Sequence, residues 1–422
     1  MIRIREYFFE KIQARFFYGW MVVATATFVM FCSGPGQSHT FSIFVDIIAT
    51  DLEISKSSIA SSYGIATLVA ALGLTRMGTI VDRYGPRKVL IAVSILLGIA
   101  CIFFGAAIGV LSLPLGFMVL RFLGQGSMML GATNIVAQWF SAKRGTAMSI
   151  AMLGFGASIA FHPAFAEWLI SLVGWRQTWI WLGILTWVLM LPILWLVAHD
   201  KPESLGLHPD GNDPNNCPNN ISEQPLVGLT LRDAMRTPAF YIIGISLFVP
   251  AMLVTSLFFF QVSIFQQQGL TSGLATKMFT ISALIMALTM PLFGRALDKT
   301  DARYIFSTAL LLLSALLVGI THVTDITTAI IYAVCFGVLN GGQMILFGFL
   351  WANYFGRKHL GSIQGVGQTI GVVGASLGPL PLGIAFDMFG TYNGALYLLA
   401  ILPMLCSILV FFLVAPSLTA ND

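Results

Sequence analysis

The sequence predicts an all-α integral membrane protein with twelve transmembrane helices arranged as two six-helix pseudo-repeats. The first supporting observation is composition: 57% of the 422 residues are hydrophobic and only 9% are charged, which excludes an ordinary soluble protein. The second is a series of apolar runs, each long enough to cross a bilayer as a helix. The third is a set of residues that recur in the second half of the chain at a nearly constant offset, which indicates duplication.

The twelve predicted spans are the apolar runs of the chain, separated by short polar or glycine- and proline-containing segments. About 20 apolar residues suffice to cross the hydrocarbon core as a helix, and each run approaches or exceeds that length. In chain order they lie at 17–47, 57–80, 88–110, 113–139, 145–172, 176–198, 238–266, 273–296, 303–321, 326–352, 360–386 and 392–415.

Basic residues are distributed unevenly between the two sides of these spans. If the N-terminus is cytoplasmic, 18 of the 22 Lys and Arg residues lie on the cytoplasmic side, three lie outside, and Arg121 lies within the fourth span. This excess predicts that both termini are cytoplasmic. The first apolar run is too long for a signal-peptide core, so we expect it to be retained as a span in the cell (plasma or inner) membrane.

Internal similarity divides the chain at a long polar segment that contains Asp213-Pro214-Asn215-Asn216. The recurring pairs are Gly78 and Gly294, Asp82 and Asp298, Phe140 and Phe355, Pro35 and Pro250, and Gly174 and Gly390, all offset by 215 or 216 positions. An even number of helices in each half makes the halves parallel repeats. The predicted organisation is a cytoplasmic N-terminus (1–16), an N-terminal six-helix bundle (17–198), a cytoplasmic linker loop (199–236), a C-terminal six-helix bundle (237–416) and a cytoplasmic tail (417–422).

A charged turn joins the second and third predicted spans. Gly85 and Pro86 favour a turn, and Arg83, Arg87 and Lys88 favour its placement on the cytoplasmic side. Asp82 ends the preceding helix, where its carboxylate can pair with a neighbouring Arg or with the N-terminus of another helix.

This turn resembles the signature of the major facilitator superfamily, and the resemblance extends over essentially the whole chain. The stretch Gly78–Lys88 is similar to that family's turn between helices 2 and 3, and Gly294–Lys299 is similar to its weaker copy between helices 8 and 9. The resemblance implies a transporter whose two halves rock about a central site. We expect a cytoplasmic latch, formed by Gly78, Asp82, Arg83, Gly85, Arg87, Lys88, Gly294 and Asp298, to hold the halves together in one state.

A narrower resemblance is to the monocarboxylate and oxalate/formate transporter branch. It is carried by Tyr18-Gly19-Trp20, by Gln138–Gly145 and by Tyr354–Gly361. Transporters of that branch commonly carry small organic anions, often with a proton, and use an Arg in helix 8 just before a Pro-x-x-Gly. Here that position is Met290, so the branch's usual anion anchor is missing.

Polar residues within the predicted spans are the candidates for function, because such groups are costly in a membrane unless they are paired or hydrated. The broken stretch of the first span offers Gln37 and His39 as a substrate or proton site, or as a kink whose polar groups satisfy one another. Arg121 is a candidate for anion binding or proton coupling, or for a structural pair with a helix end or a carboxylate. His162 is a candidate proton carrier, or a histidine bonded to a carbonyl that Pro163 leaves free.

Three further polar pairs lie at helical spacing, on the fourth, tenth and eleventh spans. Each pair presents one stripe, which either lines a substrate cavity or forms interhelical hydrogen bonds. The pairs are Asn134 with Gln138, Asn340 with Gln343, and Gln364 with Gln368.

These features predict a transporter of a small organic acid or related metabolite, coupled to a proton gradient. The sequence has no phosphate loop for ATP, and its five cysteines lack metal or redox spacing, so we expect no cofactor, no metal site and no enzymatic activity. The expected partners are a small-molecule substrate and the lipid bilayer, with no nucleic acid, and the protein is expected to be a monomer. The alternatives are proton-driven efflux of an amphipathic compound such as a drug or siderophore and, more remotely, a receptor that does not transport.

Overall fold

The computed structural model describes residues 9–54, 56–107, 112–211 and 228–416. Every secondary-structure element in these ranges is a helix, which confirms the predicted all-α fold. The predicted N-terminus (1–16) and linker (199–236) lie partly outside the described residues, and the predicted tail (417–422) lies wholly outside them.

The chain forms two compact units. The first comprises Met1–Gly228 together with Arg357–Gln368, and the second comprises Leu229–Gly356 together with Thr369–Asp422. The start of the predicted eleventh span therefore belongs to the first unit, a feature that a division of the chain at its linker does not anticipate.

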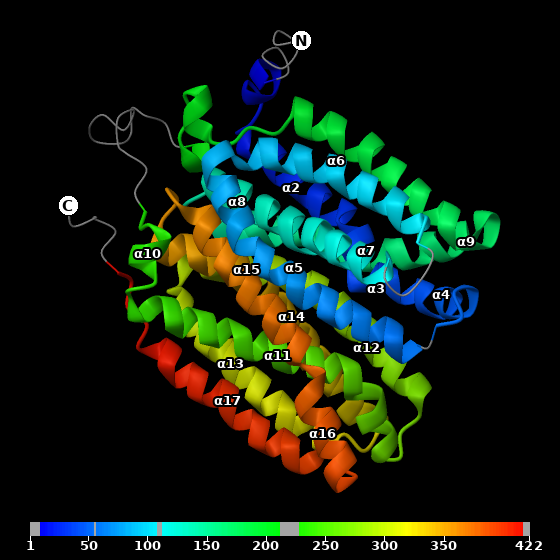
Figure 1. The fold of residues 1–422 in the computed structure, drawn as a ribbon. Helices are drawn as coiled ribbons and strands as arrows, with labels where there is room; N and C mark the ends of the chain where they lie inside the picture. Colours follow the sequence, from blue (N-terminus) through cyan, green and yellow to red (C-terminus); the bar gives the residue numbers. More distant parts are fainter. Residues whose placement is uncertain (1–8, 55, 108–111, 212–227, 417–422) are drawn as a thin grey trace. The chain divides into compact units, whose positions relative to one another are not determined.

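The first unit is built around a broken helix and four long helical segments. In it α6 and α9 run side by side, and α2 packs along α9 (Figure 1). Its elements are α2 (Gly19–Cys32), η1 (Gly34–Gly36), α3 (Ser38–Phe41), η2 (Ser42–Phe44), α4 (Val45–Asp51), α5 (Lys56–Tyr84), α6 (Pro86–Gly105), α7 (Ser112–Leu120), the π-helical η3 (Arg121–Met128), α8 (Met129–Trp139), α9 (Arg144–Leu196), η4 (Pro202–Leu205), η5 (Pro209–Gly211) and the first part of α15 (Leu360–Leu377).

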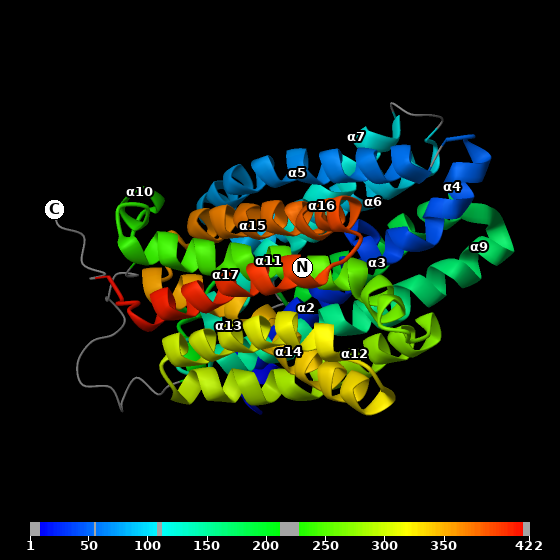
Figure 2. The same cartoon turned by 90° about the horizontal axis from the view of Figure 1, so that it is seen from below.

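The second unit contains the later helices. In it α13 runs beside α17, as Figure 1 shows, and α12 packs along α14 (Figure 2). Its elements are α10 (Leu231–Ala234), α11 (Pro238–Gln267), α12 (Ser272–Lys299), α13 (Ala302–Gly319), η8 (Ile320–His322), α14 (Ile326–Phe355), the second part of α15, α16 (Pro379–Phe389) and α17 (Asn393–Phe411).

The helices in the described ranges account for all twelve predicted spans. Ten of them are long and apolar enough to cross a membrane. One of the ten, α9, is 53 residues long and holds two predicted spans that meet at Gly174, whose φ of 78° interrupts the helical conformation as glycine readily allows. The remaining span is the first, which is broken into α2 and the short elements after it.

The turn between α5 and α6 is fixed by the carboxylate of Asp200, which follows the end of α9. Gly85 adopts φ 84°, and a Cβ there would lie 2.6 Å from the Asp200 Oδ1 atom. That oxygen accepts a hydrogen bond of 2.7 Å from the Arg87 amide at the start of α6. The Arg87 side chain donates to the carbonyls of Leu194 and Trp195, where a cation is favoured by the C-terminus of α9.

Side-chain oxygens also cap other helices or fix the turns that precede them. Asp210 accepts from the amides of three consecutive residues, 141–143, at 2.8–3.0 Å and so fixes the turn that precedes α9. In the second unit, Asp325 forms a capping box with Thr328 at the start of α14. The hydrogen bond from the Thr328 amide lowers the pKa of the Asp325 carboxyl, so this cap stabilises the fold above the carboxyl's ordinary pKa and is lost as the pH falls through the lowered value.

Candidate functional site

The first span breaks where glycine and proline are concentrated. Helix α2 ends at Cys32, Gly34–Gly36 form one 3₁₀ turn, and Gln37 is extended before α3 begins. Pro35 has no amide hydrogen to donate and fixes its own φ. The break therefore leaves backbone carbonyls, including that of Gly36, outside the regular α-helical pattern.

The break packs directly against the π-helical segment η3, with no side chain between the two backbones. A Cβ on Gly36 would lie 2.5 Å from the Gly124 Cα and 2.5 Å from the Leu120 carbonyl oxygen. A Cβ on Gly124 would lie 2.6 Å from the Gly36 Cα. This contact brings the Gly36 carbonyl to the first turn of η3, where Arg121 lies.

Gly124→Ala is expected to destabilise the protein by about 1–3 kcal/mol, the range found when a packed interior is overfilled. Two backbones would have to separate, because neither contact is with the end of a flexible side chain. Gly64→Ala is the matched control, since a Cβ at Gly64 meets nothing within 4 Å. Unfolding in detergent measures both variants, and equal stability of the two would contradict the close contact.

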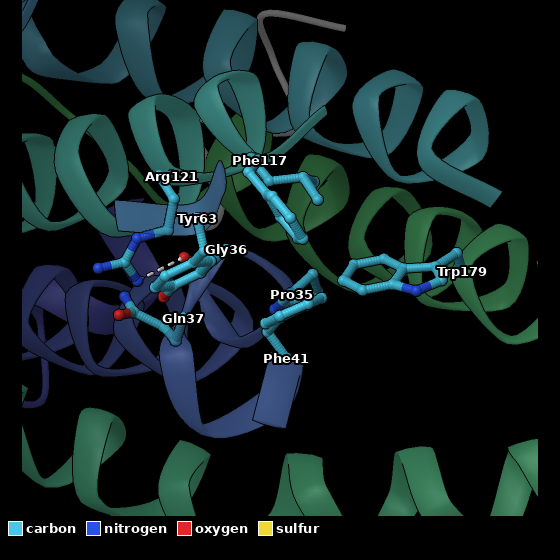
Figure 3. A pocket seen from close by; sticks show the side chains of 9 residues that line it. Pro35, Gly36, Gln37, Phe41, Tyr63, Phe117, Arg121 and Trp179 are labelled. Carbon is cyan, nitrogen blue, oxygen red and sulfur yellow. Dashed lines mark hydrogen bonds between the residues drawn. The ribbon is translucent and has the colours of Figure 1, made fainter. Parts of the chain in front are cut away.

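Arg121 lies at the centre of this region and is 7% exposed. Its Nη1 donates a hydrogen bond of 3.2 Å to the Gly36 carbonyl, as Figure 3 shows, and a second one of 3.2 Å to the Ser38 hydroxyl. Its guanidinium carbon lies 5.0 Å from the centre of the Tyr63 ring, and the Tyr63 hydroxyl donates to Ser38 at 2.9 Å. Among the side chains that the structure describes, no carboxylate forms an ion pair with Arg121, and its buried Nε has no hydrogen-bond partner.

A small cavity lies beside this guanidinium. Its volume is about 10 Å³, about the room that one water molecule requires. Four aromatic side chains form much of its wall, and Figure 3 shows Phe117 and Trp179 on the side away from Arg121. The lining residues are Pro35, Gly36, Gln37, Phe41, Tyr63, Phe117, Leu120, Arg121 and Trp179.

Two predicted coupling residues, His39 and His162, are linked through one hydroxyl. The His39 Nε2 lies 3.1 Å from the Ser158 Oγ, which lies 3.0 Å from the His162 Nδ1. The same Nδ1 is 3.3 Å from the Ser158 carbonyl oxygen, one helical turn before His162. This carbonyl is not the one that Pro163 leaves free, because the missing amide of residue 163 would bond to the carbonyl of residue 159. Gly34 leaves room for the His162 ring, since a Cβ there would lie 2.4 Å from it. Sequence reasoning missed Ser158, although its spacing of four residues from His162 on a helix was a usable signal.

Asp82 binds the start of α15 within the first unit. Its two carboxylate oxygens accept from the amides of Gly361 at 2.6 Å and Ser362 at 2.7 Å, and from the Ser362 hydroxyl at 2.5 Å. The helices touch nearby, because a Cβ on Gly78 would lie 2.1 Å from the Gly361 carbonyl oxygen. Of the two partners considered from the sequence, the structure therefore places a helix N-terminus at Asp82, and no ion pair joins this carboxylate to an Arg in the part of the chain that is described.

The other residues of the predicted latch are arranged differently. Arg83 and Lys88 are exposed, and the Arg83 guanidinium carbon lies 5.4 Å from the centre of the adjacent Tyr84 ring. Gly294 and Asp298 lie on the last turns of α12 in the second unit. The role of this set in holding the two halves together stays a prediction.

Two of the predicted polar pairs meet within the first unit. The Asn134 Nδ2 donates to the Gln364 Oε1 at 3.4 Å, and the Gln138 Nε2 donates to the Arg357 carbonyl at 2.9 Å. Arg357 also forms an ion pair of 3.0 Å with Glu203. The Asn134–Gln364 bond is interhelical, which was the alternative to a cavity lining, whereas Gln138 binds the turn that precedes α15. The substrate-cavity assignment stays a prediction.

The remaining candidates lie along α14, α15 and α12. The Asn340 Nδ2 donates to the Phe336 carbonyl of its own helix at 2.8 Å. The Gln343 Nε2 is buried and has no partner among the described residues, and Gln368 is half-buried. Met290 is buried at 1% exposure in α12, at the position where the resembled branch has its Arg.

Comparisons with known proteins place these features in a family context. Human monocarboxylate transporter 2 is 24% identical over 400 residues, which cover 89% of this chain and 81% of the transporter. A probable nitrate/nitrite transporter of Mycobacterium tuberculosis is 26% identical over 372 residues, which cover 79% of this chain and 82% of that protein. The crystal structure of a human organic anion transporter matches with a TM-score of 0.71, covering 93% of this chain and 99% of its own at 14% identity, which is a likeness of fold.

The family model of the Major Facilitator Superfamily matches residues 26–379 and again residues 256–422. The first match alone covers well over half of the chain and includes the break in the first span, Asp82 and Arg121. The predicted family resemblance is thereby confirmed, and with it a multi-pass membrane protein whose relatives transport solutes and do not catalyse reactions. This chain belongs to the Major Facilitator Superfamily of membrane transporters.

Proposed function

We propose that the protein is a secondary active transporter of a small organic anion, coupled to protons and working by alternating access. The observation that carries the proposal is Arg121, a buried guanidinium with no carboxylate partner among the described side chains. A buried cation that is neutralised only by carbonyl and hydroxyl dipoles attracts an anion strongly, because the surroundings screen its charge weakly. Arginine also presents a planar fork that suits a carboxylate.

The surroundings of Arg121 support its acting as the anion anchor in place of the Arg that the branch has at the position of Met290. The guanidinium already has one side occupied by the Gly36 carbonyl and Ser38, while its Nε remains without a partner. Ser38 itself is exposed, so the cluster is open at that residue. A carboxylate that reached Ser38 could bind both the serine hydroxyl and the guanidinium.

The names of two relatives support a small anion as the substrate, and one of them supports a carboxylate. One is a monocarboxylate transporter and the other a probable nitrate/nitrite transporter, and both names denote small anions. We propose further that the protein resides in the cell membrane with both termini in the cytoplasm, acts as a monomer and needs no cofactor beyond a proton gradient.

The proposed cycle uses Asp82 as part of the gate. Its three hydrogen bonds to residues 361 and 362 stabilise one arrangement of α5 and the start of α15. Breaking these bonds during the cycle would let α5 and the start of α15 move apart, which gives the second conformation that alternating access requires.

The purified protein in proteoliposomes tests this function. With an acidic exterior and an alkaline interior, we expect uptake of at least one of labelled formate, oxalate, L-lactate and sulfoacetate, and its loss when a protonophore collapses the gradient. Empty liposomes provide the background. No gradient-driven uptake of any of these anions would contradict the proposal, and proton-driven expulsion of ethidium in its place would favour efflux of amphipathic compounds.

A further inference from the structure

We propose that His39, Ser158 and His162 form a single proton-binding site, and that Arg121 couples this site to the bound anion. The inference rests on the proposed function and identifies the residues that carry the proton. The three groups join α3, which follows the break in the first span, to α9, which runs beside α2.

The chemistry of the three groups suits one mobile proton. A serine hydroxyl has one hydrogen to donate and two lone pairs to accept with, whereas each imidazole nitrogen can donate or accept according to its protonation. If the His39 Nε2 carries hydrogen, it donates to the Ser158 Oγ, which donates to the His162 Nδ1. The proton moves when the His39 N–H bond breaks, the Oγ gains that hydrogen, and the original Oγ–H passes to the His162 Nδ1.

Each end of this chain has a partner for the proton it receives. A protonated His162 Nδ1 can donate to the Ser158 carbonyl at 3.3 Å, and the Ser158 hydroxyl is then free to donate back to His39. The two rings are 6.4 Å apart between centroids, so a second positive charge on the pair would be opposed by the first. The site is therefore built to hold one excess proton, shared between two histidines.

Few other charged or titratable groups surround the pair among the described residues. Arg121 on η3 and Tyr63 on α5 reach the His39 side through Ser38. The side chains with ring contacts to the pair are aromatic: Phe155 lies against His39, and Phe31 and Phe161 lie against His162. The positive charge of Arg121 is thus the dominant fixed charge near the site.

The adjacency of Ser38 and His39 provides the coupling. An anion bound at Arg121 and Ser38 would offset the guanidinium charge that opposes a proton on His39. A proton on His39 would favour the anion to the same extent, since coupling between two binding equilibria is reciprocal. A monovalent anion and one proton would then bind and move together.

The first test follows protonation directly and needs no substrate. The chain has six histidines, so the signals of protein carrying ¹⁵N-labelled histidine in nanodiscs can be assigned with single-histidine variants and followed from about pH 5 to pH 9, the range of histidine titration. We expect the His39 and His162 signals to change together as one proton binds, and to become independent in Ser158→Ala. Ser149→Ala is the control, because Ser149 is a buried serine on the same helix that bonds only to the Thr146 carbonyl among the contacts described. Independent titration in the wild type, no titration of either histidine, or no effect of Ser158→Ala would overturn the shared site.

The second test separates proton coupling from anion transport. His39→Gln and His162→Gln, checked for wild-type thermal stability, are expected to lower gradient-driven uptake of labelled formate, oxalate or L-lactate about tenfold or more, a typical size for coupling between sites. Exchange of labelled for unlabelled anion requires no net proton movement, so both variants are expected to retain exchange at an anion concentration high enough to offset their weaker anion binding, and this exchange is expected to lose its dependence on pH. Loss of exchange together with uptake, or retention of gradient-driven uptake, would overturn the assignment of these histidines, whereas failure of the wild type to transport any anion would overturn the proposed function instead.

Discussion

Arg121→Met is expected to lower the initial rate of carboxylate uptake about 100-fold, since truncating one partner of a buried charged pair costs about 2–5 kcal/mol and each 1.4 kcal/mol is about tenfold. Methionine retains most of the apolar volume but removes both hydrogen bonds of 3.2 Å and the stacking on Tyr63. Arg121→Lys keeps the charge and loses the planar fork, so an intermediate reduction is expected.

The measurement is uptake at saturating and at low anion concentration in proteoliposomes. Arg176→Met is the matched control, because it removes a guanidinium whose side chain is 40% exposed and whose partner is Asp51 at 2.9 Å. Exposed pairs contribute about 0–1 kcal/mol, so this variant should transport at nearly the wild-type rate. A folded Arg121→Met protein that transports as well as the control would show that the anion binds elsewhere.

Asp82→Asn is expected to lower the uptake rate about tenfold while leaving the affinity for the anion nearly unchanged, because an unsatisfied buried polar group costs about 1–3 kcal/mol. The carboxylate accepts from two amides and one hydroxyl through both of its oxygens. In the asparagine variant the side-chain NH₂ would face a donor, so at least one of these bonds would be lost.

A control for this variant must remove a helix cap without touching the proposed gate. Asp325→Asn serves, since Asp325 accepts from the Thr328 amide at the start of α14 and has no contact with the predicted latch or with residues 361 and 362 among the described bonds. If both variants lose stability and rate equally, Asp82 is an ordinary cap. If Asp82→Asn leaves uptake unchanged, the gate proposal is wrong.

The sequence predicts the fold well because the bilayer imposes a simple requirement on it. Every span must be a long apolar helix, and all twelve predicted runs correspond to helices in the described ranges. The break in the first span was also foreseeable, since Pro35 between two glycines cannot continue a regular helix. The boundaries differ where charged residues extend a helix, as at Asp82 and Arg83 in the last turn of α5.

The site could be predicted only in part. Arg121, His39 and His162 stand out because ionisable residues are rare in spans. Their partners do not, because a hydroxyl or a carbonyl looks ordinary in a sequence: Ser158 joins the histidines only once α3 and α9 are packed together. The roles of Asp200 and Asp210 were hidden for the same reason, since Asp200 caps α6 and Asp210 binds the turn before α9, each more than 60 positions away in the chain.

The contact between the Gly36 and Gly124 backbones has a consequence for how such a transporter can change during evolution. Any side chain at either position would displace the main chain that presents a carbonyl to Arg121, so neither position can vary without repositioning the guanidinium. The wall of the neighbouring cavity is different, because Phe41, Tyr63, Phe117 and Trp179 contribute side chains whose size can be altered one at a time. Exchange of one ring can therefore reshape the space beside the guanidinium, while the backbone contact that holds the charge stays in place.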